Sequence, residues 1–138
     1  MHTLRIWFCL IVIFSLISVS VSAADYWNEF RGPAANGHSP SEKLPVTWSE
    51  KENVAWKTEI SGKAWSSPVV WGNQVWVTNA TPDGKKLYAV CVDAKSGDVL
   101  HNVTVFDIEN PMFCIGYNSY ASPTPVVEEN RVWVHFGS

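Results

Sequence analysis

The residue types that could perform catalysis are few in this 138-residue chain, and they lie apart. No two of the four histidines have the short spacing of a zinc site, and no serine lies in a Gly-x-Ser-x-Gly elbow. The acidic residues Asp93, Asp98, Asp107 and Glu109 fall in or beside turn-forming sequences, where carboxylates are usually solvated. We therefore assign no catalytic, cofactor-binding or metal-binding residue and favour a non-enzyme over an enzyme.

Two segments have the residue types of a binding surface. Trp65-Ser66-Ser67 and Tyr120-Ala121-Ser122 each precede the first strand of a sequence repeat described below, which predicts equivalent places for them. An aromatic ring beside small hydroxyls can bind an extended peptide or a sugar. The alternative is that these side chains pack one repeat against the next. The candidate binding residues are Trp65, Ser66, Ser67, Tyr120 and Ser122.

Cysteine chemistry offers one further candidate. Cys91 and Cys114 are separated by 23 positions (114 − 91), and an oxidising compartment would permit a disulfide between them. A buried free thiol at Cys91 is an equally good interpretation. The third cysteine, Cys9, lies in an N-terminal apolar run and would be lost if that run were removed.

The first 23 residues have the pattern of a secretory signal peptide. A single positive charge at Arg5 precedes the almost wholly apolar residues 6–19, and Val21-Ser22-Ala23 places small residues at the cleavage position. The apolar run is shorter than the roughly 20 residues of a spanning helix, although an uncleaved membrane anchor is the alternative. Cleavage after Ala23 predicts a periplasmic or secreted protein without a membrane partner.

The composition of the remaining chain limits the classes of partner that it could bind. Loss of Arg5 leaves nine basic residues (10 − 1) against 13 acidic ones, a net charge near −4. A nucleic-acid surface needs a basic face, so we expect no nucleic-acid partner. Seven of the eight tryptophans lie after the signal peptide, and such large apolar side chains suit a protein of many short strands.

The organisation of the chain follows from an internal repeat. The sequence of residues 67–77 returns at residues 124–134 with identical Pro, Val, Val, Asn, Val, Trp and Val at an offset of 57 (124 − 67). Such a repeat indicates copies of one small unit stacked side by side. Residues 66–106 predict four short antiparallel strands joined by three tight turns, about the size of one β-propeller blade. No convincing helical period occurs after the signal peptide, so we predict an all-β fold.

The segments around this unit differ in character. Residues 24–52 are interrupted by proline and glycine and predict an irregular N-terminal arm. Residues 53–60 alternate apolar and polar side chains, which predicts a half-buried strand. Residues 107–121 predict a long inter-blade loop, and residues 122–138 begin the second blade.

The sequence Leu87–Leu100 resembles the repeat of pyrroloquinoline-quinone-type propellers, with Ala89, Asp93, Ser96 and Gly97 near the places that this repeat requires. The wider chain is similar to secreted propeller proteins that are related to the propeller lipoprotein of the outer-membrane assembly machinery. The resemblance implies an incomplete β-propeller of four-stranded antiparallel blades: one full blade plus part of a second, as the N-terminal fragment of a longer protein.

The resemblance also carries functional expectations. Residues 53–60 would be the strand that closes the ring, displaced here because its partner blade is missing, and the candidate binding residues would line the channel rim. Quinone-dependent dehydrogenases of this fold use a calcium site and often a pair of adjacent cysteines. This chain has no two adjacent cysteines. We therefore expect neither pyrroloquinoline quinone nor calcium as a cofactor of this chain.

The sequence thus favours a non-catalytic, extracytoplasmic binding or scaffolding module. Its expected partners are proteins, or an extended ligand at the propeller rim, with the other blades missing. One alternative is the N-terminal part of a pyrroloquinoline-quinone-dependent dehydrogenase whose site lies in other blades. A second alternative is a truncated gene product without a function of its own.

Overall fold

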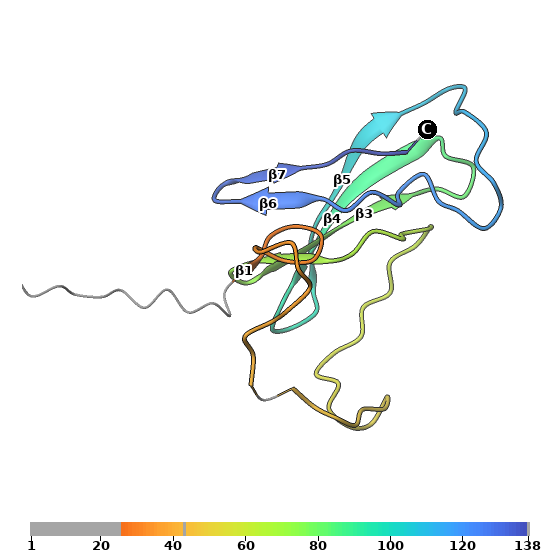
Figure 1. Ribbon diagram of the computed structural model, residues 1–138. Coiled ribbons are helices and arrows are strands. Elements are labelled where there is room, and N and C mark those ends of the chain that lie inside the picture. The colour runs from red at the N-terminus through yellow and green to blue at the C-terminus, as the bar shows by residue number, and fades with distance from the viewer. Residues whose placement is uncertain (1–25, 43, 138) are drawn as a thin grey trace, which may run out of the picture.

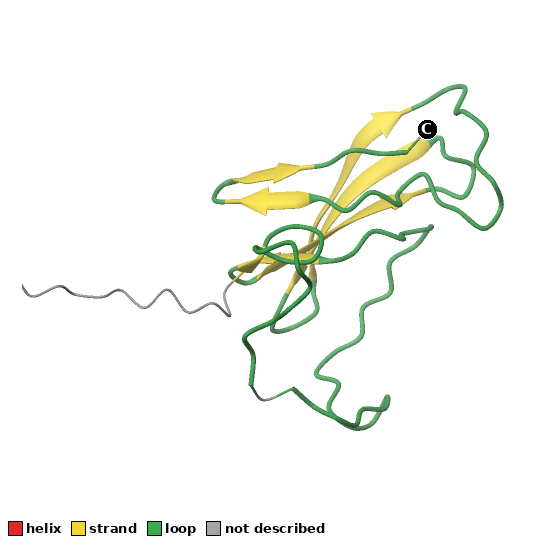
Figure 2. Cartoon of the chain, viewed as in Figure 1, coloured by secondary structure: helices red, strands yellow, loops and turns green. Residues whose placement is uncertain are grey.

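The computed structural model describes residues 26–42 and 44–137, which form two antiparallel β-sheets of five and two strands (Figures 1 and 2). No helix occurs among these residues, which confirms the all-β prediction. The expected signal peptide at residues 1–23 lies outside the described part. In the described part, no helix is long and apolar enough to cross a membrane.

The larger sheet has its strands in chain order, each antiparallel to its neighbour. The third and fourth strands of this sheet pair in continuous register, from Gln74 opposite Asp93 to Ala80 opposite Leu87. Two irregularities in the next ladder, between Leu87 and Tyr88 and between Cys91 and Val92, shift the register of the outermost strand. The strands are β1 (Tyr26–Trp27), β2 (Val69–Trp71), β3 (Gln74–Ala80), β4 (Lys86–Asp93) and β5 (Val99–Asp107).

Strand β1 lies in the segment that was predicted to be an irregular arm. Tyr26 pairs with Trp71 and Trp27 pairs with Val70, so the sheet has a fifth strand on the side of β2. The prediction of no strand here was wrong because two residues are too few to show an alternating pattern. The aromatic ring of Tyr26 lies 5.4 Å from that of Trp71, measured between ring centroids.

Residues 53–60 are the second difference from the sequence expectation, because they form no strand. The predicted alternation is nevertheless present, since Trp56, Thr58 and Ile60 are partly buried and the residues between them are exposed. The segment is held by side chains: Trp56 Nε1 donates to the Ala94 carbonyl at 3.0 Å, and the Thr58 hydroxyl donates to the Gly97 carbonyl.

The turn between β4 and β5 is shaped to receive the Trp56 ring. Gly97 has φ +81°, and a Cβ at this position would lie 2.8 Å from the indole. Asp93 closes the turn, because its Oδ1 accepts from the backbone N–H groups of Lys95 and Ser96, each at 2.8 Å. An Asx turn of this kind is one of the tight turns that the sequence predicted within residues 66–106.

The second sheet is the hairpin of β6 (Val126–Glu128) and β7 (Arg131–Trp133), and β6 lies against β2 (Figure 1). The Val127 N–H donates to the Asn28 carbonyl at 2.9 Å. Val69, the third residue of the first copy, and Val127, the fourth residue of the second copy, are both buried. The core is therefore formed between the two copies of the repeat, as well as within the five-stranded sheet.

Candidate functional site

The structure brings the starts of the two repeats together. The backbone N–H groups of Trp65 and Ser66 both donate to the Ala121 carbonyl, each at 3.1 Å. Next to this contact, the Ser67 N–H donates to Thr124 Oγ1 at 3.1 Å. The segments predicted to form a binding surface are thus hydrogen-bonded to each other through their main chains.

The hydroxyl groups of Ser66, Tyr120 and Ser122 have partners within the protein. Ser66 Oγ accepts from the Thr78 N–H at 3.0 Å. Ser122 Oγ contacts Asn118 Oδ1 at 2.7 Å and the Ser119 carbonyl at 2.8 Å. These bonds join Ser66 to β3 and Ser122 to its own loop, so both hydroxyls are already bonded within the protein.

Tyr120 is positioned by its hydroxyl and by the turn under its ring. The hydroxyl donates to the Met112 carbonyl at 2.6 Å. A Cβ at Gly84, where φ is +73°, would lie 2.4 Å from the ring, so only glycine leaves space for Tyr120 there. The ring therefore packs between the 108–120 loop and the β3–β4 turn.

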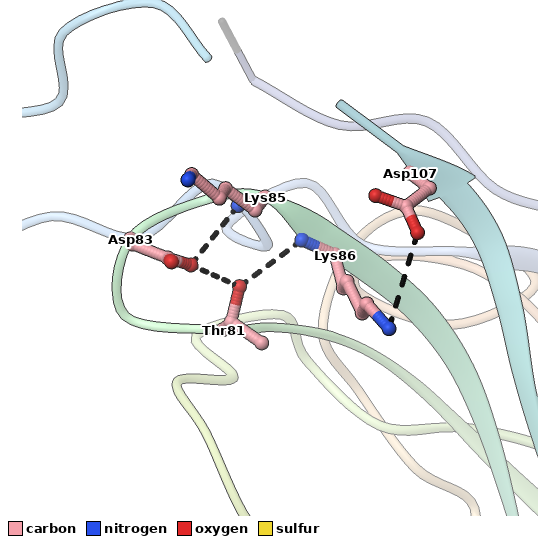
Figure 3. A network of polar contacts seen from close by, with 5 residues as sticks. All are labelled: Thr81, Asp83, Lys85, Lys86 and Asp107. Atoms are coloured by element: carbon pink, nitrogen blue, oxygen red, sulfur yellow. Dashed lines mark hydrogen bonds and ion pairs between the residues drawn. The ribbon is translucent and has the colours of Figure 1, made fainter. Parts of the chain in front are cut away.

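A network of polar contacts fixes that turn (Figure 3). Asp83 Oδ1 accepts from the Thr81 hydroxyl at 2.5 Å and from the Lys85 N–H at 3.1 Å. The bond from Thr81 is the main cause that lowers the pKa of Asp83 from its ordinary value of 3.8. Thr81 Oγ1 also accepts from the Lys86 N–H at 3.0 Å, and the Lys86 ammonium lies 3.9 Å from Asp107 Oδ2.

Of the candidate residues, Trp65 presents the most free surface, because its side chain is 55% exposed. The chemistry that this junction offers to a ligand is therefore mainly an aromatic face. Both Cys91 and Cys114 are free thiols; Cys91 is buried and Cys114 is partly exposed. Burial raises the pKa of Cys91 to about 11, which keeps it protonated and unreactive.

Strand β5 is an open edge that the sequence analysis did not identify as a functional surface. It is nine residues long, and eight of its residues are exposed. Five of its nine side chains are apolar, and Asp107 at its end is its one Asp, Glu, Lys or Arg residue. The large apolar residues exposed here, each between 44% and 52%, are Val99, Leu100, Val103 and Phe106.

The sequence also did not predict a pocket and a groove, because each is formed by segments far apart in the chain. An apolar pocket of about 520 Å³ lies between Leu87, Phe106 and Phe136. A more polar groove of about 650 Å³ lies between the turns of the two hairpins. The recurrence of Trp76 as Trp133 at the repeat offset was the sequence signal that these turns are related.

The described residues contain no group of three or more His, Cys, Asp or Glu side chains arranged to hold a metal ion. No protein-family model matches the chain, and no curated protein or solved structure matches it either.

Proposed function

We propose that this chain is a non-catalytic binding module of the β-propeller type that acts outside the cytoplasm and holds protein partners. The observation that carries the proposal is the open edge of β5, which has exposed apolar side chains along nine residues. An edge of this length and composition is a template for pairing with another strand. Soluble proteins usually protect such edges with charged side chains, proline or a covering element, and the interior of β5 contains no Asp, Glu, Lys, Arg or Pro.

The propeller assignment is supported by the way in which the repeats contact each other. In a propeller, equivalent strands of adjacent blades lie side by side, and here β2 and β6 are equivalent strands in contact. The apolar pocket beside Phe136 offers a surface on which the third strand of a second blade would pack. We therefore regard the five-stranded sheet as one blade extended by β1, and the β6–β7 hairpin as the inner half of the next blade.

The proposed mode of partner binding is strand addition at β5. Main-chain hydrogen bonds from the free edge would supply affinity, and alternate side chains would supply specificity. Leu100 and Phe106 would contribute the apolar contacts, since both are exposed in the absence of a partner. The proposal requires no change in the sheet itself, because β4 already holds β5 along its other edge.

A charged substitution in the centre of β5 tests this mode. Val103→Lys places a charge on an exposed position of the edge, and Val46→Lys places the same charge on the arm, where the side chain is 93% exposed. We expect proteins of the extracytoplasmic fraction to be retained by the full chain and by Val46→Lys, and lost from Val103→Lys. Retention of the same proteins by Val103→Lys, with an unchanged circular dichroism spectrum, would contradict strand addition.

The rival enzyme hypothesis has a direct test. The full chain is titrated with pyrroloquinoline quinone and calcium while absorbance and dye reduction are followed. The binding-module proposal predicts neither saturable quinone binding nor dye reduction. Saturable binding together with dye reduction would favour the dehydrogenase alternative and would overturn the proposal.

A further inference from the structure

We infer that the groove between the turns of the two hairpins is a binding site for a neutral carbohydrate. The groove has a volume of about 650 Å³, within the range of roughly 300–1,000 Å³ that is typical of small-molecule sites. One wall comes from the β2–β3 hairpin and the other from the β6–β7 hairpin. Its lining combines indole rings with amide, carboxylate and guanidinium groups, including Trp71, Gln74, Trp76, Glu128 and Arg131.

The first wall presents an oriented hydrogen-bond donor. Trp76 Nε1 donates to Gln74 Oε1 at 3.0 Å, which determines which end of the amide is the oxygen. The NH₂ group of Gln74 then has its two N–H bonds for other partners. The Trp76 ring is itself held by stacking on His101, with 5.8 Å between centroids and 17° between planes.

The second wall presents an oriented acceptor. Glu128 Oε1 lies 3.3 Å from Trp133 Nε1 and 3.5 Å from the Arg131 guanidinium, and both groups donate to it. These donors occupy the same oxygen, so the second carboxylate oxygen of Glu128 is available to a ligand. The side chain is 49% exposed, which makes that oxygen accessible from solvent.

The two walls are related by the sequence repeat. Trp76 and Trp133 are equivalent residues, separated by the repeat offset of 57 (133 − 76). In each hairpin the indole N–H binds a polar side chain of the same hairpin, which is an amide in one and a carboxylate in the other. The result is one donor and one acceptor, both lining the groove and both partly pre-organised before a ligand binds.

An apolar surface completes the chemistry of the groove. The Trp71 ring lines it and is braced by Tyr26, at 5.4 Å between centroids and 35° between planes. The negative face of an indole attracts the weakly positive C–H groups of a pyranose ring. A sugar hydroxyl both donates and accepts, so neighbouring hydroxyls can bind the amide of Gln74 and the carboxylate of Glu128 at the same time.

A proline-rich peptide fits this groove less well, although such peptides also bind to aromatic surfaces. The indole N–H groups of Trp76 and Trp133 are already bonded within the protein and do not face the carbonyls of a peptide as free donors. Proline also has no N–H to offer to the carboxylate of Glu128. The pattern of free donors and acceptors therefore favours hydroxyl groups.

The test uses the full chain labelled with ¹⁵N at the tryptophan indoles. It is titrated with maltose, cellobiose, xylobiose, laminaribiose and N,N′-diacetylchitobiose, up to concentrations above the dissociation constant on the order of 1 mM expected for a few hydrogen bonds. We expect saturable shifts of the Trp71 and Trp76 signals with at least one disaccharide. The signal of Trp48, which is 68% exposed on the arm, should stay unchanged.

Variants separate specific binding from contact with any exposed indole. Gln74→Ala and Glu128→Ala should each weaken binding about tenfold, as expected for the loss of one hydrogen bond, and Glu109→Ala should not. An unchanged Trp56 indole signal shows that each variant keeps the fold, because this group is bonded to Ala94. The inference is overturned if no disaccharide shifts Trp71 and Trp76, if both alanine variants bind as the original chain does, or if only a proline-rich peptide binds.

Discussion

The backbone N–H of Ser67 donates to Thr124 Oγ1 at 3.1 Å, and these two residues occupy the same position in the two copies of the repeat. The contact joins the copies at the residue where their similarity begins. Beside it, Ala121 accepts from the backbone N–H groups of Trp65 and Ser66, the two residues before the first copy. The repeat therefore supplies both the two units and a contact that sets their alignment.

Removal of the Thr124 hydroxyl should loosen the contact between the repeats. Thr124→Ala leaves the partly buried Ser67 N–H without its acceptor, which should lower the free energy of unfolding by about 1 kcal/mol. Thr124→Ser keeps the hydroxyl and should lose less. Urea unfolding followed by tryptophan fluorescence measures both changes. Equal destabilisation by alanine and serine would assign the effect to the lost methyl group.

The close packing of the Tyr120 ring on Gly84 predicts that alanine is more destabilising at Gly84 than at Gly72. Gly84 and Gly72 both have positive φ, so alanine should cost roughly 1–2 kcal/mol at either position. At Gly84 the new Cβ would also lie 2.4 Å from the Tyr120 ring, whereas at Gly72 nothing lies within 4 Å. We expect Gly84→Ala to lower the free energy of unfolding by about 1–3 kcal/mol more than Gly72→Ala does. Similar midpoints in urea for the two variants would argue against a tightly packed Tyr120.

The strands of the larger sheet could be predicted closely because their signals are local. Alternation of side chains and turn residues such as Gly72 and Gly97 are visible within a few residues, and the four strands β2 to β5 lie between Val69 and Asp107, close to the predicted residues 66–106. The short strand β1 was missed because it is specified by its partner β2. Its two residues become a strand only when the fold brings Tyr26 beside Trp71.

The candidate site was predictable in part, because the repeat is visible in the sequence. The repeat indicated that the starts of the two units are equivalent, and the structure places them in contact. It did not indicate that the hydroxyls of Ser66 and Ser122 bond within the protein, since their partners Thr78 and Asn118 are set by tertiary packing. The groove lined by Trp71 and Trp76 depends on the same packing and has no local signal.

The segment before the sheet should show a contrast in hydrogen exchange. Residues 54–60 lie in no strand, so their backbone amides should exchange rapidly. The indole N–H of Trp56 should exchange more slowly, because it donates to the Ala94 carbonyl in a partly buried site. Amide exchange followed by NMR measures both in one sample. Strong protection of the backbone from Val54 to Ile60 would show that the segment pairs as a strand in solution.

The turn that receives Trp56 should weaken in acid. Hydrogen bonds from the Ser96 and Lys95 backbone lower the pKa of Asp93 below its ordinary value of 3.8, so the folded state binds this proton less readily than the unfolded state does. The carboxylate therefore stabilises the fold above pH 3.8, and this contribution is lost as the pH falls through the lower pKa of the folded state.

Asp93→Asn tests that assignment, because asparagine keeps an acceptor oxygen for the turn but cannot titrate. We expect the original chain to be more stable than the variant at about pH 7, and the difference to shrink as the pH falls below 3.8. Urea midpoints measured across this range, with Glu42→Gln on the exposed arm as the control, report the difference directly. A difference that does not change with pH would mean that the geometry of the turn, and not the charge of Asp93, carries its contribution.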